Sequence, residues 1–200
     1  YFHRADLPED REVLAQVLIA ALGAGHPLNI DGIGGGAAVT TKVAMLSPGS
    51  DGWADVDYFF AQVNPLEREV DYRPTCGNIL AGVGPAAIEM GLVAPDGPVT
   101  RVRIRAVNTG ARVEALVETP GGTVNYDGDT AIDGVPGAAA PIRLDFLDTA
   151  GSVCDGMLPT GQARESIEGI DVTCIDVAMP LMIARAQDFG VTGYETREAL

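Results

Sequence analysis

The sequence is poor in several features that would point to well-known classes of protein. It has no run of about 18 apolar residues, so we expect no membrane span. Basic residues are scarce, since 13 lysines and arginines stand against 28 aspartates and glutamates, for a formal net charge of −15. Binding of nucleic acid needs a basic patch, and we expect no nucleic-acid partner. An anionic ligand would be repelled by the overall field, so local donors would have to bind it.

Histidine and cysteine are also rare, which restricts the chemistry. The histidines are His3 and His26, and the cysteines are Cys76, Cys154 and Cys174. These residues form no close-set ligand pairs, so we expect no structural zinc site, and a histidine-based triad has little to work with. The odd number of cysteines, in dissimilar contexts, indicates free thiols in a reducing cytoplasm rather than a disulfide framework.

The glycine-rich stretch at 31–36 does not fit a nucleotide-binding loop. Its glycines precede a predicted strand instead of joining a strand to a helix, and it lacks the Gly-Lys-Ser/Thr ending of a phosphate-binding loop. A flexible turn is favoured over a loop that contacts a ligand. The sequence therefore implies no nucleotide cofactor.

Apolar patterning predicts a mixture of helices and strands. A helix is expected at 7–23, with Asp6 as its N-cap and Gly23 closing it. A central apolar helix at 78–90 contains two glycines and a proline, which implies close backbone packing. Short strands separated by glycine turns, around one central helix, indicate an α+β fold in which a sheet curls around the helix. The strands are expected at 39–46, 56–63, 101–107, 112–117, 123–126, 140–146, 171–176 and 181–186.

Cys76 and the two residues that follow it form the most informative motif. They lead directly into the apolar stretch at 79–83, so the thiol is placed at the start of a helix. Unpaired backbone N–H groups and the positive end of the dipole favour a thiolate there and also bind carboxylates. The alternative is an inert buried cysteine that acts as a small hydrophobe.

Lys42 is the second informative residue, because it interrupts a strand that is otherwise apolar or small. Lysine is rarely buried without a reason. One interpretation is an edge-strand lysine that faces water. The other is an amine partly desolvated in a cleft, where it could act as a base.

With these motifs the sequence resembles the PrpF family of isomerases. The resemblance implies a diaminopimelate-epimerase-like fold of two similar domains, each a β-sheet or barrel wrapped around a central helix, with the site between them. Residues 1–185 would then form the N-terminal domain, without its upstream strand and loop, and 186–200 would begin the connection to a second, absent domain. The matching stretches are 30–35, 41–44, 54–63, 76–85, 108–110, 133–137, 158–161 and 191–195.

The resemblance also implies roles for individual residues. Lys42 and Cys76 match the catalytic pair, while Gly77 and Asn78 match the turn that binds a carboxylate. Thr41 and Asn108 are expected to contact the substrate. Thr41 stands where the family often has serine, and Thr75 where it often has asparagine, which could alter carboxylate contacts.

The activity implied by this resemblance is an allylic 1,3-proton shift on a small unsaturated tricarboxylate, with 4-oxalomesaconate tautomerisation in aromatic-acid degradation as the first expectation. No cofactor is implied, and a homodimer is possible. Lys42 would remove the proton, and Cys76 would either return it or polarise the intermediate. Three alternatives stay open: a 2-methylaconitate cis–trans isomerase, an epimerase with two cysteines, and a non-catalytic carboxylate-binding relative.

Overall fold

The computed structural model describes residues 1–26, 28, 32–35 and 37–199. Residues 31 and 36 of the glycine-rich stretch, and residue 30 of the matching stretch at 30–35, lie outside this description. The chain divides into two compact units, residues 1–147 and 148–200. The predicted domain extents of 1–185 and 186–200 stay a prediction. In the described part of the chain, no helix has the length and apolarity needed to cross a membrane.

The first unit is built on one large sheet with two faces. Within the described residues its strand order is β1-β2-β3-β5-β6-β7, with β4 paired to β3 beside this path. The pairs β1–β2 and β3–β5 are parallel, and the others are antiparallel. The strands are β1 Phe2–His3, β2 Lys42–Pro48, β3 Val56–Val63, β4 Val70–Asp71, β5 Val99–Ala106, β6 Arg112–Glu118 and β7 Ile142–Leu147.

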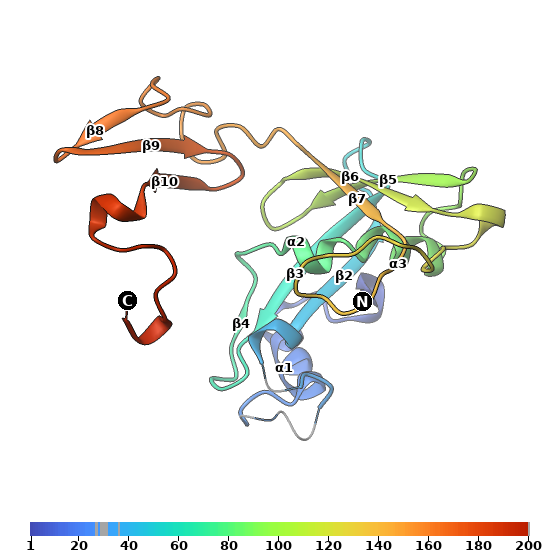
Figure 1. Ribbon diagram of the computed structural model, residues 1–200. Helices are drawn as coiled ribbons and strands as arrows, with labels where there is room; N and C mark the ends of the chain where they lie inside the picture. The colour runs from blue at the N-terminus through green and yellow to red at the C-terminus, as the bar shows by residue number, and fades with distance from the viewer. Residues whose placement is uncertain (27, 29–31, 36, 200) are drawn as a thin grey trace. The chain divides into compact units, whose positions relative to one another are not determined.

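Helices cover both faces of the β2–β3 part of this sheet. The short helices α2 (Gly77–Leu80) and α3 (Val83–Glu89) lie along one face and contact β2, β5 and β6 (Figure 1). Helix α1 (Arg11–Leu22) packs on β3 and β4 from the other face. Side chains alternate along β3, so Tyr58 and Phe60 join the core with α2 and α3, while Phe59 joins the core with α1.

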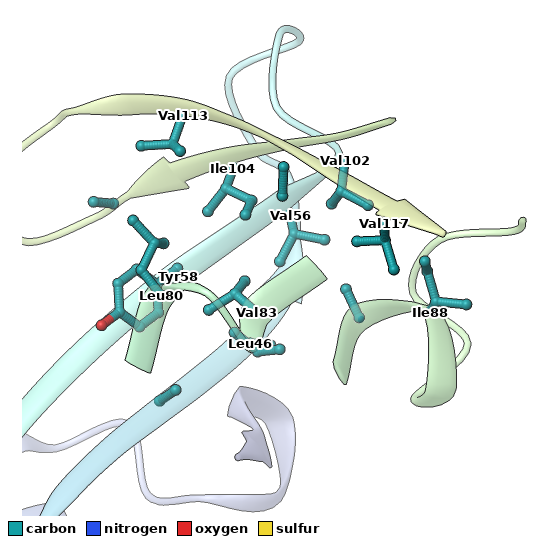
Figure 2. Close-up of a cluster of buried hydrophobic side chains, with 14 of the residues drawn as sticks. Leu46, Val56, Tyr58, Leu80, Val83, Ile88, Val102, Ile104, Val113 and Val117 are labelled. Carbon is teal, nitrogen blue, oxygen red and sulfur yellow. The ribbon is translucent and has the colours of Figure 1, made fainter. Parts of the chain in front are cut away.

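The α+β prediction is confirmed, but no barrel closes in the described residues. Strands β1 and β7 stand at the two ends of the strand order, so the sheet is open. It nevertheless curls around α2 and α3, and the side chains of both halves of the sheet meet the helices in one core (Figure 2). The buried side chains of this core include Leu46, Leu80, Val83 and Ile104.

The predicted N-terminal helix starts later than expected. Residues Arg4–Asp6 form a 3-10 turn, which removes Asp6 from the capping position. The helix is capped instead by Asp10, whose carboxylate accepts hydrogen bonds from the N–H groups of Glu12 (2.9 Å) and Val13 (3.0 Å). The C-terminal prediction is confirmed, since Gly23 has the left-handed φ of 73° typical of a helix end.

The central helix is broken rather than continuous. It divides between Leu80 and Val83, with Gly82 as the N-cap of α3. Pro85 lies in the first turn of α3, where a missing N–H breaks no intrahelical hydrogen bond. The expected close packing is confirmed at Gly84, because an added Cβ would lie 2.8 Å from Cγ2 of Val117.

Two other expectations about strands are wrong. Residues 38–40 form a 3-10 turn, so β2 begins at Lys42 rather than at 39. Residues 123–126 form no strand, because the segment is attached by single contacts rather than by a ladder. The N–H of Asn125 donates to the Glu118 carbonyl (2.9 Å), and the Tyr126 hydroxyl lies 2.9 Å from the Glu89 carboxylate on α3.

The second unit contains a small antiparallel sheet in the order β10-β9-β8. Its strands are β8 Glu165–Ile167, β9 Ile170–Asp176 and β10 Pro180–Ala184. Asp176 is fully buried, and its carboxylate accepts hydrogen bonds from the Ser152 hydroxyl (2.5 Å) and from the N–H groups of Val153 (2.6 Å) and Cys154 (2.7 Å). This carboxylate fixes the loop that precedes β8.

Candidate functional site

The amine of Lys42 lies on the face of the sheet that α2 and α3 cover. Lys42 is the first residue of β2, and it shares its face with Ala44 and Leu46, which belong to the core around those helices. Its Nζ donates a hydrogen bond to Oε1 of Gln62 (2.7 Å) and lies 5.6 Å from the centroid of the Phe60 ring. The side chain is half-buried, so it does not simply extend into water.

Gln62, on β3, is a residue of this site that the sequence analysis did not single out. It stands directly opposite Lys42 in the antiparallel pair of β2 and β3. Its Nε2 faces oxygen atoms of Ala38 (3.1 Å), Thr41 (3.2 and 3.3 Å) and Val63 (3.2 Å). A usable signal was present in the sequence, since Gln62 is a lone amide at an inward position of an apolar strand, after Tyr58 and Phe60.

The side chains of Thr41 and Asn108 form hydrogen bonds within the protein. Thr41 is fully buried, and its hydroxyl donates to the Val63 carbonyl (2.7 Å). The amide of Asn108 accepts from the Phe60 N–H (2.8 Å) and donates to the carbonyls of Phe60 (2.9 Å) and Tyr72 (2.5 Å). Both side chains hold the strand that carries Gln62 and Phe60, and their expected contact with substrate stays a prediction.

Cys76 stands at the N-cap of α2, with extended backbone angles of φ −140° and ψ 115°. It is half-buried and packs against the core that contains Tyr58 and Phe60. Gly77 and Asn78 follow it as the first residues of α2, and both are exposed. The N–H groups of such positions have no acceptor inside the helix, so they can bind an acceptor from outside.

Two phenols lie close to the thiol. The Tyr58 side chain is fully buried, and its hydroxyl makes no hydrogen bond of standard geometry in the described structure, with the Thr75 side chain and the Cys76 backbone as its polar neighbours. Burial, and then the charge of Cys76, raise the pKa of Tyr58 far above its ordinary value. The same two causes raise the pKa of Tyr1, whose hydroxyl donates to the Ile79 carbonyl (2.6 Å). Both phenols therefore stay protonated near neutral pH.

The structure thus brings Lys42 and Cys76 to one face of the sheet. The amine lies over the Phe60 ring, and the thiol packs on the core to which that ring belongs. An open groove of about 710 Å³ has Gln62 in its wall, but neither Lys42 nor Cys76 lines it. The rest of its wall is formed by Ala38, Asn64, Pro65, Glu69, Val70, Asp71 and Arg73.

The charges along this groove are mixed. Arg73 pairs with Asp71 at 2.9 Å, and Glu69 adds a further negative charge. The hydrogen bond from Arg73 lowers the pKa of Asp71 to about 2, so this carboxyl remains ionised. Over the described ranges, no group of three or more histidine, cysteine, aspartate or glutamate residues is arranged to hold a metal ion.

Fold and site together define an α+β protein with a lysine on one sheet face and a cysteine at the start of the broken helix that covers this face. The PrpF protein family matches residues 1–200, and the chain belongs to this family.

Curated relatives and a solved structure agree with this assignment. The chain is 53% identical over 189 residues to YbhH of Escherichia coli (strain K12), which its name describes only as a candidate isomerase, covering 94% of this chain and 54% of that protein. It is 51% identical over 200 residues to a 4-oxalomesaconate tautomerase of Pseudomonas putida (strain KT2440), covering 100% and 55%.

A crystal structure of methylitaconate-delta-isomerase superposes with a TM-score of 0.87 at 43% identity, covering 96% of this chain and 51% of that one. The chain therefore spans about half the length of the proteins it matches.

Proposed function

We propose that this protein is a cofactor-independent isomerase that moves a proton across an allylic unit of an unsaturated tricarboxylate. The observation that carries the proposal is the placement of the Lys42 amine and the Cys76 thiol around one aromatic core on one sheet face. The substrate proposed first is 4-oxalomesaconate, because a relative with 51% identity is named for its tautomerisation.

In the proposed mechanism the neutral amine of Lys42 removes a proton from a carbon beside a carbonyl or carboxylate group. The electron pair left behind delocalises into a dienolate, and a proton then adds to the third carbon of the allylic unit. No atom is oxidised or reduced, and the proton count is unchanged. Cys76 either returns the proton or polarises the intermediate from the other side.

Binding of the substrate would depend on local donors, because the chain carries a net charge of −15. The N–H groups of Gly77 and Asn78 are proposed to hold one carboxylate and to stabilise the negative charge that develops. By analogy with oxyanion holes, each such donor contributes about 3–4 kcal/mol to transition-state stabilisation. The diaminopimelate-epimerase-like pairing of two domains, the cytoplasmic location and the homodimer belong to the same proposal.

The test is Lys42→Ala in the full-length protein, with turnover of 4-oxalomesaconate followed by proton NMR in heavy water. Loss of a positioned general base lowers turnover by about 10²–10⁴-fold. Wild-type protein should place deuterium at the allylic position, and the variant should not. Arg197→Ala, an exposed change outside the first unit, serves as the control. Near-normal turnover by the lysine variant would eliminate the assigned base.

The same assay separates the alternatives. Deuterium exchange into 2-methylaconitate but not into 4-oxalomesaconate would favour the sister isomerase. Exchange without movement of the double bond would favour an epimerase. A non-catalytic relative would show neither exchange, and a Cys76 that reacts poorly with iodoacetamide, without protection by a tricarboxylate, would favour it.

A further inference from the structure

We propose that Gln62 is the positioning residue of this site, holding the Lys42 amine over the Phe60 ring through its side-chain carbonyl. This inference rests on the proposed function for its catalytic meaning, although the contacts stand on their own. The hydrogen bond from Nζ of Lys42 to Oε1 of Gln62 is 2.7 Å long.

The orientation of the Gln62 amide is fixed by what surrounds its nitrogen. Four oxygen atoms lie within 3.1–3.3 Å of Nε2, from Ala38, Thr41 and Val63. A flipped amide would place its oxygen against these oxygens and its NH₂ group against the donor amine, so both ends would lose their partners. The carbonyl of Gln62 therefore stays directed at Lys42.

The Gln62 side chain carries no charge, and this affects the protonation of the proposed base, Lys42. An ion pair with a carboxylate would favour the charged, proton-bearing form of the amine. In the part of the chain that the structure describes, Lys42 forms no ion pair with an acidic side chain. Glu69 and Asp71 line the groove beyond Gln62, and Asp71 is already paired with Arg73.

On the helix side of this face, where α2 contacts β2, the titratable groups are Cys76 and the phenols of Tyr58 and Tyr1 beside it. Because both the ammonium and the neutral amine carry N–H donors, Gln62 can accept a hydrogen bond from Lys42 before and after proton transfer.

Gln62→Met tests the role, because methionine keeps the length of the side chain and removes both polar ends. A charge-assisted hydrogen bond favours the ammonium over the neutral amine, so its loss should move the acidic limb of the kcat/KM profile down by about one pH unit. The less constrained amine should also lower kcat by about 10-fold to 100-fold with little change in KM. Gln16→Met, at an exposed site on α1, is the matched control and should leave both quantities unchanged.

A second readout does not need the isomerase activity. Lys42 is the only lysine in the sequence, so its acetylation by a succinimidyl ester can be followed in one peptide by mass spectrometry. At pH 8 the Gln62→Met protein should label about tenfold faster than wild type. Faster labelling of the variant, together with no activity of the wild-type protein on tricarboxylates, would refute the proposed function and still support the contact between Gln62 and Lys42.

Thr41→Val is the fallback if the methionine variant does not fold. It removes the hydroxyl that helps to hold the Gln62 nitrogen, and it should produce smaller shifts in the same directions. An unchanged acidic limb together with an unchanged labelling rate, in a folded Gln62→Met or Thr41→Val protein, would overturn the proposal. A fall in kcat without a change in the acidic limb or in the labelling rate would also overturn the proposal, since a purely structural role predicts that result.

Discussion

Gly84→Ala should destabilise the first unit, although alanine is the better helix former. Gly84 lies in α3 at the point where this helix meets β6. An added Cβ would lie 2.8 Å from Cγ2 of Val117 and 3.1 Å from Cβ of Ala115. Carbon atoms in good contact are about 3.5–4.0 Å apart, so either the helix or the strand must move.

The size of the effect follows from two opposing contributions. Overpacking a well-packed core costs about 1–3 kcal/mol, while replacing glycine by alanine inside a helix gains up to about 1 kcal/mol. Neither neighbour yields easily, because Val117 is β-branched and Cβ of Ala115 moves only with its backbone. We therefore expect a net loss of about 1–2 kcal/mol in the free energy of unfolding.

Urea unfolding of the full-length protein measures this loss, and Gly82→Ala provides the comparison. The Cβ added at Gly82 would meet the Tyr1 hydroxyl at 2.1 Å, but this is the far end of a side chain that can rotate away. Rotation would break the hydrogen bond from Tyr1 to Ile79, and alanine at the N-cap of α3 gains no interior helix propensity, so we expect a loss of about 1 kcal/mol, at the lower end of that for Gly84→Ala. A Gly84→Ala protein as stable as wild type, or more stable, would refute the packing argument.

Two further predictions concern buried polar groups. Tyr58→Phe removes a buried hydroxyl that makes no hydrogen bond of standard geometry in the described structure, so it should raise the free energy of unfolding by about 1 kcal/mol. A loss of similar size in urea would show that Thr75 or the Cys76 backbone bonds this hydroxyl. For Asp176, burial opposes ionisation, but hydrogen bonds from Ser152, Cys154 and Val153 outweigh it and lower the pKa to about 2. The stability that ionised Asp176 contributes is therefore complete above the unfolded pKa of 3.8 and is lost as the pH falls toward 2. In thermal melts, Asp176→Asn should therefore flatten the dependence of Tm on pH in this range. An unchanged dependence of Tm on pH would contradict the assignment.

Local patterns in the sequence were enough to locate most elements. The strand expected at 56–63 is β3 with the same bounds, and the helix end expected at Gly23 shows the left-handed backbone of a C-terminal glycine. These features depend on neighbouring residues alone. Asp6, the expected cap, belongs to the 3-10 turn Arg4–Asp6, of which the pattern gave no sign, and Asp10 caps the helix instead.

The contacts that define the site were harder to foresee. Lys42 and Cys76 could be picked out because each breaks the character of its surroundings. The role of Gln62 depends on the pairing of β2 with β3, and the engagement of Asn108 depends on a loop reaching strand β3 from 48 residues away. Such contacts follow from strand pairing across the sheet, which alternation within one strand does not specify.

The register of β2 against β3 ties the stability of the sheet to the chemistry of the site. Both faces of β2 are apolar beyond Lys42, with Val43 and Met45 on one side and Ala44 and Leu46 on the other. Hydrophobic burial alone therefore distinguishes poorly between the observed register and a slip by one residue. A slip would turn Lys42 toward the apolar core beneath α1 and would separate it from Gln62, leaving a charged amine to be desolvated without an acceptor. The hydrogen bond between Lys42 and Gln62 therefore favours the observed register over that slip.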